Sequence, residues 1–298
     1  MKLKLIVNNL DWRARMDLGV SNEDWVAWAK SLGANLMILP EAAGPEAFVA
    51  AGMKVVFSPA PKGSGWGTAI VVDAGVEIRR ITHVKNKEYV LDKHFPGTVV
   101  AADVFIEGKL IATIIGLHIK FRKTGGKITS DPARDLLTIL PDIQAIHEER
   151  NAPLIIGGDF NFPMSDVPYC LKKTAPGGIE LVDPFAQLNP KTFRQRHGRE
   201  LWRLDQAWLS KDLASKVTAR RGGIGGFPDA FSRSDHAPLL LEIDMDLDSV
   251  TCACGAKLRR ADGNYATSIR CPRCQRITPY ERPQPGDPSK VLNPTAKN

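Results

Sequence analysis

Apolar residues along the chain fall into short runs, and several of these runs end at a polar residue. The clearest run, residues 154–156, is followed by Gly157 and Gly158 and then by Asp159 and Asn161. A short apolar run bounded by glycines is typical of a buried strand, and glycine lets the backbone turn where a side chain would clash. An aspartate in this position is also ordinary turn chemistry. Taken alone, the stretch predicts a strand end that is either a polar site or a turn.

Other predicted strands carry polar residues at or beside their ends in the same way. They are residues 2–10 at Asn8 or Asn9, 35–39 at Glu41, 111–117 at His118, 204–209 at Asp205, and 239–243 after Asp235 and His236. Because the strand ends of one sheet system meet at one face, we expect these side chains to converge there. For the first strand the pattern leaves Asn8 and Asn9 as alternatives, and Asn8 is our prediction.

Helical spacing of apolar residues occurs between these strands. Residues 21–32 begin with a capping sequence, residues 43–52 form a shorter stretch, and residues 131–150 form a long one that contains Pro141. The proline predicts a helix that is dented or split. Residues 211–221 predict a further helix or the remnant of one.

The composition is that of a globular protein with a basic tail. The chain has 298 residues, of which 43% are hydrophobic, enough for one large domain and a small module. The net charge is +7, but residues 251–298 hold nine Lys/Arg and three Asp/Glu, which leaves 31 bases and 30 acids in the first 250 residues. Such a tail can bind polyanions through counterion release.

The sequence shows no signal for a membrane or for secretion. No apolar stretch approaches the ~20 residues that a membrane helix requires, and the first ten residues are too short and too polar for a signal peptide. We therefore expect an intracellular, cytoplasmic protein with no membrane partner, and we expect a monomer.

Four of the five cysteines lie in the tail, as Cys252, Cys254, Cys271 and Cys274. Two close pairs separated by a loop suit a tetrahedral zinc site to which each pair contributes two ligands. The alternative is two disulfides, which a reducing compartment disfavours. We predict a structural Zn²⁺ in this tail. Cys170 stands alone and is interpreted as a small buried residue.

Three segments resemble one known family. Gly157-Gly158-Asp159-Phe160-Asn161, Arg203-Leu204-Asp205 and Ser234-Asp235-His236-Ala237-Pro238 resemble the endonuclease/exonuclease/phosphatase superfamily. The resemblance spans residues 1–247. It implies a two-sheet α/β sandwich flanked by helices, with a magnesium-dependent phosphodiesterase site at one edge. The rest of the chain is then a zinc-ribbon-like module, residues 248–280, and a disordered tail, residues 281–298.

The resemblance also implies roles for the converging residues. Glu41, Asn8 and Asp235 would hold Mg²⁺ or Mn²⁺, because hard cations prefer oxygen ligands. The catalytic group would be Asp159, Asn161, His236, Asp205 and His118. Asp159 would deprotonate the attacking water and Asn161 would hold that water or a phosphate oxygen. Asp205 would pair with His236, which contacts the phosphate, and His118 would be a second phosphate contact or a proton donor.

The predicted substrate is nucleic acid, with DNA favoured over RNA. The basic segment 191–203 mixes cations with aromatic residues, a composition that suits a phosphate backbone. Its predicted substrate-binding residues are Arg194, Arg196, Arg199, Trp202 and Arg203. A histidine at position 118 is closer to DNase-like members than to abasic endonucleases, which place a tyrosine motif there. Two alternatives stay open: a phosphatase or phosphodiesterase acting on a lipid head group or small molecule, and a catalytically silent nucleic-acid-binding protein.

Overall fold

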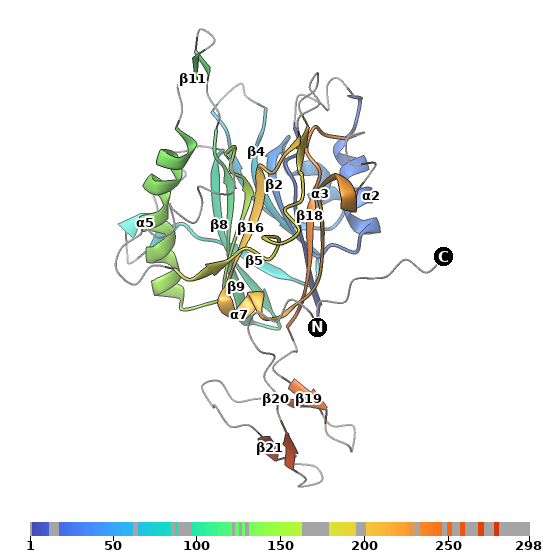
Figure 1. Ribbon diagram of the computed structural model, residues 1–298, viewed down its shortest axis with the longest axis vertical. Helices are drawn as coiled ribbons and strands as arrows, with labels where there is room; N and C mark the ends of the chain where they lie inside the picture. The colour runs from blue at the N-terminus through green and yellow to red at the C-terminus, as the bar shows by residue number, and fades with distance from the viewer. Residues whose placement is uncertain are drawn as a thin grey trace.

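Two six-stranded sheets form the body of the molecule in a computed structural model (Figure 1). The structure describes residues 2–11, 18–61, 65–84, 87–88, 97–120, 123–124, 127–128, 131–162, 179–194, 201–227, 229, 233–245, 249–251, 257–259, 268–270 and 277–279. The four tail cysteines, Arg196, Arg199 and Cys170 lie outside these residues, so the predictions that concern them, with the zinc module and the tail, remain predictions.

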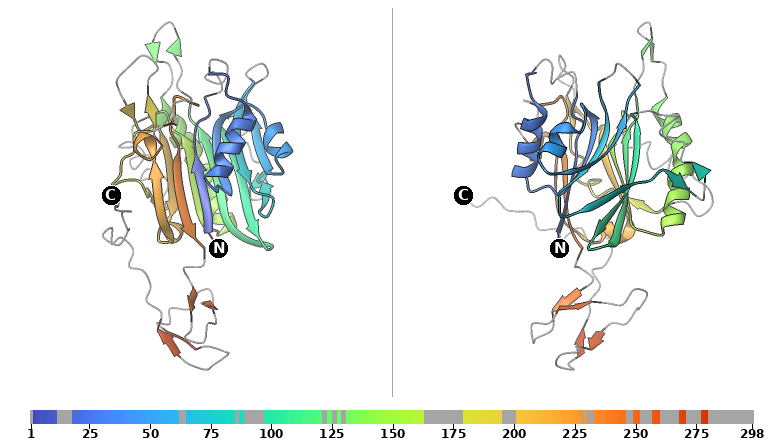
Figure 2. Two further views of the ribbon diagram at one scale, coloured as in Figure 1. Left: turned by 90° about the vertical axis from the view of Figure 1, so that its right-hand side faces the viewer. Right: turned by 180° about the vertical axis from the view of Figure 1, so that it is seen from behind.

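The first sheet has the strand order β17-β18-β1-β2-β4-β3. Its strands are β1 (Lys2–Val7), β2 (Leu36–Ala42), β3 (Lys54–Pro59), β4 (Gly67–Val72), β17 (Val217–Gly222) and β18 (Leu239–Asp244). Strand β1 pairs in parallel with β2 and antiparallel with β18, so the N-terminal strand lies in the middle of the sheet. Helices α2 (Asn22–Ser31) and α3 (Glu46–Ala50) cover its outer face (Figure 2).

The second sheet has the order β13-β16-β12-β9-β8-β5. Its strands are β5 (Glu77–Arg80), β8 (Val99–Ile106), β9 (Lys109–His118), β12 (Leu154–Asp159), β13 (Leu181–Val182) and β16 (Asp205–Ser210). Helix α5 (Pro132–Arg150) packs its apolar side on the outer face of this sheet. It is one helix rather than two, with Pro141 inside it and exposed. The predicted α/β sandwich flanked by helices is therefore confirmed.

Shorter elements complete the described residues. The helices are α7 (Lys211–Ala214) and α8 (Gly223–Gly226), and the two-stranded pairs are β6 (His83–Val84) with β7 (Lys87–Glu88), β10 (Lys123–Thr124) with β11 (Lys127–Ile128), β14 (Phe193–Arg194) with β15 (Leu201–Trp202), β19 (Ser249–Thr251) with β20 (Lys257–Arg259), and β21 (Ser268–Arg270) with β22 (Ile277–Pro279). The predicted helix over 211–221 is wrong after Ala214, because the next residues pair with β18 as edge strand β17. No described helix is both long and apolar enough to cross a membrane.

The core between the sheets fixes which side chains point into the sandwich. In β1, Leu3, Leu5 and Val7 belong to the inner core, whereas Ile6 packs under α2 and α3. The same alternation of faces, with a period of two residues, holds in β9, β12 and β16. A polar residue at the end of such a strand therefore points between the sheets if it shares the parity of the core residues.

Candidate active site

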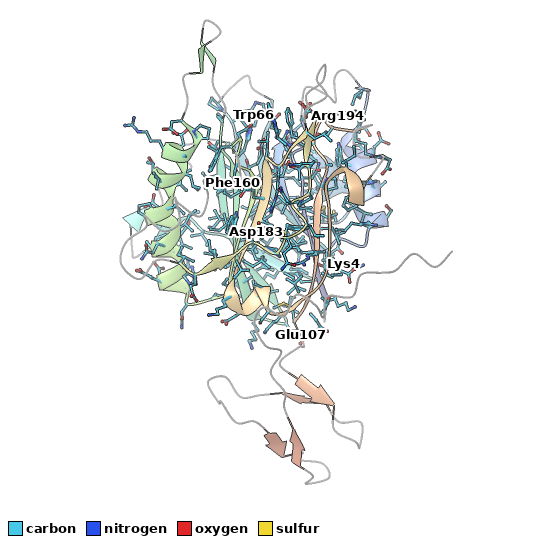
Figure 3. All side chains as sticks on the ribbon, viewed as in Figure 1. Lys4, Trp66, Glu107, Phe160, Asp183 and Arg194 are labelled. Carbon is cyan, nitrogen blue, oxygen red and sulfur yellow. The ribbon has the colours of Figure 1, made fainter. Side chains whose placement is uncertain are left out.

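The predicted polar residues meet at one end of the sandwich. In the second sheet, Asp159 at the end of β12 pairs with His118 on the parallel strand β9 and with Asp205 on the antiparallel strand β16. All three share the parity of the inner core residues of their strands. In Figure 3 the labelled Trp66 and Arg194 lie toward this end, and Lys4 and Glu107 lie toward the opposite one. The convergence inferred from the strand ends is therefore present in the structure.

Glycine allows β12 and β9 to approach closely at this end. Gly158 has φ +141°, in the region that side chains rarely adopt, and a Cβ there would overlap the backbone carbonyl oxygen of Leu117. A Cβ at Gly157 would lie 2.8 Å from Ile38 Cδ1 of the opposite sheet. Glycine is therefore required at Gly158, whereas a side chain at Gly157 would have to displace the end of Ile38.

Asn9 reaches the site, and the prediction of Asn8 is wrong. Asn9 Nδ2 donates to Asp159 Oδ2 at 2.9 Å and to Glu41 Oε1 at 3.4 Å. Asn8 donates its amide to the Asn9 carbonyl oxygen, and it borders a small cavity under α2 that Trp25 also lines. The alternation of β1 explains the difference, because Asn9 continues the inner series of Leu5 and Val7 and Asn8 continues the outer one.

His236 and Asp205 form a buried pair. His236 Nδ1 lies 2.7 Å from Asp205 Oδ2, and Asp205 Oδ1 accepts a hydrogen bond from the Asn9 backbone N–H at 3.3 Å. Burial lowers the pKa of His236, but Asp205, followed by Asp159 and Asp235, raises it, and the net pKa is well above the ordinary value of 6.5. The imidazole is therefore held as imidazolium at neutral pH.

Asp159 is a buried carboxylate with two amide partners. Asn9 and Asn161 each donate a side-chain N–H to Asp159 Oδ2, at 2.9 Å and 3.0 Å, and the Asn161 backbone N–H donates to Oδ1 at 2.9 Å. Burial is the largest influence and raises the pKa of Asp159 from 3.8 to about 7; His236 opposes the rise and Asp205 adds to it. A carboxylate with this pKa can accept a proton near neutral pH.

His118 is neutral in the same surroundings. Burial, then the charges of Lys120 and His236, lower the pKa of His118 to about 3. Its Nε2 lies 3.3 Å from Glu41 Oε1, and its ring meets the Trp66 ring edge-on at 5.1 Å, with the Lys120 ammonium 4.8 Å over that indole. A neutral imidazole donates one N–H and carries no charge, so His118 can hydrogen-bond a substrate but cannot neutralise it.

Asp235 lies close enough to two other carboxylates, those of Asp11 and Glu41, to be influenced by their charge. Burial raises the pKa of Asp235 from 3.8 to about 7; His236 lowers it, and Asp11, which also hydrogen-bonds to Asp235, raises it together with Glu41. Sequence reasoning missed Asp11. The signal was its spacing of two residues from Asn9, although Asp11 has φ 40° and lies beyond the regular strand, so alternation alone does not place it.

Hard oxygen donors at this position fit a divalent cation. Asp235 Oδ1 is buried and accepts no hydrogen bond from the described residues. Within the described part of the chain no three His, Cys, Asp or Glu side chains are spaced to enclose a metal ion. Mg²⁺ does not require such a set, because it typically binds one or two carboxylates and completes its shell with water and phosphate oxygens. Glu41 and Asp235, with Asp11 beside them, meet that requirement.

An aromatic surface adjoins the pair formed by His236 and Asp205. Trp202 is 46% exposed and stacks on Phe193 with ring centroids 6.1 Å apart, and Phe193 lies 5.0 Å from the His236 ring. Arg194 is exposed on the same hairpin, and its backbone N–H donates to the Asp235 carbonyl oxygen at 3.0 Å. Both predicted substrate residues therefore lie beside the site.

Arg203 lies in the interior instead. Its guanidinium donates to both carboxylate oxygens of Asp183, at 2.7 Å and 2.8 Å, and its side chain is 2% exposed. Arg203 thus belongs to a buried ion pair, and the structure does not present it on the surface that carries Arg194 and Trp202. A sequence pattern cannot distinguish an exposed, substrate-binding arginine from one in a buried ion pair, because the partner carboxylate is 20 residues away.

Comparisons with known proteins agree with this fold. A family model described as Endonuclease/Exonuclease/phosphatase family matches residues 22–236. No curated protein matches the sequence. Among solved structures, truncated Caenorhabditis elegans TDP2 is 16% identical with a TM-score of 0.58, and the match covers 82% of this chain and 98% of that one. An AP endonuclease from Archaeoglobus fulgidus is 18% identical with a TM-score of 0.56 and coverages of 82% and 100%. D. rerio TDP2 complexed with single strand DNA product is 18% identical with a TM-score of 0.57 and coverages of 82% and 99%.

Proposed function

The chain belongs to the endonuclease/exonuclease/phosphatase family, and from this premise we propose that it is a metal-dependent nuclease that hydrolyses phosphodiester bonds, with DNA favoured over RNA. The observation that carries the proposal is the contact network of Asp159, Asp205 and His236. It joins a carboxylate with a pKa of about 7 to an imidazolium in one buried site. Phosphodiester hydrolysis needs both a proton acceptor and a cationic contact for the phosphate.

Asp159 takes the proton of the attacking water. Its carboxylate is fixed by the amides of Asn9 and Asn161, so it cannot rotate away from an incoming nucleophile. Because its pKa lies close to neutral pH, the carboxylate is substantially ionised there and still basic enough to accept a proton. Asn161, held by the Ile119 carbonyl oxygen and by Asp159, orients the same water or a phosphate oxygen.

His236 donates to the phosphate. Asp205 binds Nδ1, which leaves Nε2–H of the imidazolium directed toward Asp159 and Asp235, at 3.9 Å and 3.6 Å. A phosphate oxygen bound between these groups would receive a charge-assisted hydrogen bond. His118 adds a neutral donor on the opposite side of Asp159.

Glu41, Asp235 and Asp11 would hold Mg²⁺ or Mn²⁺. When bound, such an ion neutralises phosphate charge and stabilises the leaving oxygen. The side chains that would hold it are close to one another, and their mutual repulsion contributes to the raised pKa of Asp235. A cation at this position would relieve that repulsion.

A nucleic-acid substrate is favoured by the surface beside His236. Trp202 and Phe193 offer stacked aromatic faces, which bind bases with little regard to sequence. Arg194 adds a positive charge next to them. A small phosphate ester has no row of bases to stack on these aromatic rings.

The test is incubation with end-labelled single- and double-stranded DNA and RNA, each with Mg²⁺, with Mn²⁺ and with chelator. We expect cleavage of DNA that chelator abolishes. Absence of cleavage of every polymer, together with turnover of a small phosphate ester, would instead support the phosphatase alternative. Absence of both activities would support the silent binding protein.

A substitution at Asp159 separates chemistry from binding. The D159N enzyme should bind DNA with unchanged affinity and cleave it at least 10²-fold more slowly, because it lacks the proton acceptor. E148Q, which changes an acid on the exposed side of α5, is the matched control and should cleave normally. Equal cleavage by D159N and the parent would contradict the assignment.

The tail carries a separate proposal. We propose that Cys252, Cys254, Cys271 and Cys274 hold one structural Zn²⁺ and that the basic tail adds affinity for nucleic acid. Elemental analysis of the purified protein should find one zinc per chain, and replacement of Cys252 and Cys254 by serine should remove it. Zinc content that is unchanged by the replacement would contradict the proposed ligands.

A further inference from the structure

We propose that Thr192 is a positioning residue that holds Asp205 and His236 in contact, and its catalytic meaning rests on the proposed function. Thr192 is completely buried, and its hydroxyl accepts from backbone N–H groups. It lies at the start of the hairpin that carries the aromatic surface, directly before Phe193. It contacts the two segments that carry Asp205 and His236.

The side chain of Thr192 holds the Asp205 segment. Thr192 Oγ1 accepts a hydrogen bond from the Asp205 backbone N–H at 3.0 Å and another from the Leu204 N–H at 3.1 Å. These two N–H groups lie at the start of β16, whose first residue is Asp205, and the hydroxyl oxygen supplies their acceptor. A β-branched side chain has few rotamers when buried, so this acceptor is fixed in place.

The backbone of Thr192 joins the same segment to the His236 segment. Its N–H donates to the Trp202 carbonyl oxygen at 2.8 Å, and its carbonyl oxygen accepts from the Ala237 N–H at 2.6 Å. Next to it, Phe193 pairs with Trp202 on one side and with His236 on the other. Residues 192–194 are therefore the middle of a short three-stranded arrangement between 201–202 and 235–237.

This arrangement sets the distance between the two members of the pair. Asp205 and His236 are 31 residues apart in the sequence and come within 2.7 Å. Thr192 is hydrogen-bonded to the backbone of Asp205 itself and to the residue that follows His236. A displacement of Thr192 would change the Asp205–His236 distance, and displacements of about 1 Å can cost 10²-fold in rate.

The first experiment compares T192V with T192S in the full-length protein. Valine keeps the shape but removes the acceptor of two buried N–H groups, whereas serine keeps the oxygen. We expect T192V to lower kcat on DNA by about 10- to 100-fold with KM changed less than about threefold, and T192S to stay within about threefold of the parent. In a D205N background, adding T192V should lower kcat by less than about twofold, because the carboxylate through which Thr192 acts is already gone.

The second experiment measures the Asp205–His236 contact directly, by NMR, and does not depend on enzyme activity. The Nδ1–H proton of His236 should give a low-field NMR resonance in the parent, which T192V shifts or removes and T192S retains. T113V is the matched control, because it removes a buried threonine hydroxyl that is bonded to Asp103 in the middle of β9, and it should leave that resonance unchanged. If T192V does not fold, T192C, whose sulfur is a weaker acceptor, should shift the resonance in the same direction.

The two measurements distinguish the two proposals. An unchanged resonance and unchanged kcat in T192V or T192C would overturn the role of Thr192. A protein that cleaves no nucleic acid would overturn the proposed function, and the resonance would still decide whether Thr192 holds the pair.

Discussion

His118 and His236 are equally buried, at 5% exposure each, and they prefer opposite charge states. The pKa of His236 is well above 6.5, and that of His118 is about 3. The difference lies in their neighbours. His236 Nδ1 lies 2.7 Å from Asp205 Oδ2, whereas His118 Nε2 lies 3.3 Å from Glu41 Oε1, and the charges of Lys120 and His236 oppose protonation of His118. Burial disfavours the charged form of both, and only a close, well-oriented carboxylate reverses that preference.

One site thus holds both a charged and a neutral imidazole, and under the proposed function both would contact the phosphate. The side of Asp205 and His236 supplies charge, and the side of His118 supplies a neutral N–H donor. Asp159 lies between them, within 4.0 Å of His118 Nε2 and 3.9 Å of His236 Nε2. The predictions below remove one side of this contrast at a time.

Replacing Asp205 by asparagine should have the largest effect, because it makes the surroundings of His236 resemble those of His118. Loss of the carboxylate leaves burial as the main influence, so the pKa of His236 falls. We expect turnover to fall by about 10²- to 10⁴-fold. NMR titration of the metal-free protein measures the pKa, and D103N, at a buried acid bonded to Thr113 and Arg150, should leave the His236 pKa unchanged.

Replacing Asp159 by asparagine should stabilise the protein above neutral pH. The folded pKa of Asp159 is raised from 3.8 to about 7, so its contribution to stability is present below pH 3.8 and is lost as pH rises to about 7. Asparagine does not ionise, so the free energy of unfolding of the variant should rise relative to that of the parent, by up to about 4 kcal/mol, between pH 4 and pH 8. Urea unfolding at pH 4 and pH 8 measures the difference, and an equal stability gap at both pH values would contradict it.

Replacing His118 by alanine should cost less than the loss of Asp205. A neutral hydrogen bond to a charged group contributes about 1.5–3 kcal/mol, so turnover should fall about 10- to 100-fold. H118Q keeps an N–H donor and should recover most of this loss. Steady-state cleavage rates decide the point, and a loss as large as that of D205N would show that His118 carries charge during the reaction.

Replacing Ser21 by alanine should have the smallest effect and should leave the contrast between the histidines intact. Ser21 caps α2 by accepting from the Asp24 N–H at 3.1 Å, in a capping box with the Asp24 carboxylate. We expect a loss of about 1 kcal/mol in the free energy of unfolding. Chemical denaturation measures it, and a change in either histidine pKa would be unexpected at this distance in the fold.

Much of the site followed from strand ends and short motifs. Asp159, His118 and Asp205 were predicted as residues at strand ends, and the structure brings them together with His236. Glu41 was also predicted, although alternation alone would turn it outward. A register shift after Leu39 and a φ of 54° at Glu41 redirect its side chain toward Asn9 and His118. Bulges of this kind re-aim a side chain and have no simple sequence pattern.

Asn9 and Thr192 show what short-range patterns miss. The Asn8-Asn9 pair is ambiguous until the faces of β1 are known, and these faces depend on which residues the opposite sheet buries. Thr192 looks like an ordinary polar residue within a basic segment, and its importance depends on backbone groups of residues 204, 205 and 237. Arg203 is the opposite case: the sequence pattern predicts a substrate contact, but its ion pair with the distant Asp183 makes it part of the interior.

The sequence by itself determined most of the long strands, the glycines at Gly157 and Gly158, the family resemblance and most of the residues that gather at one end. Local periodicity and motif spacing carry that information, because they depend on neighbours a few positions away. Only the tertiary structure decided that Asn9 faces the site, that Asp11 joins Asp235, and that His118 and His236 differ in charge. Those outcomes depend on burial and on partners far apart in the chain, which periodicity along the sequence does not encode.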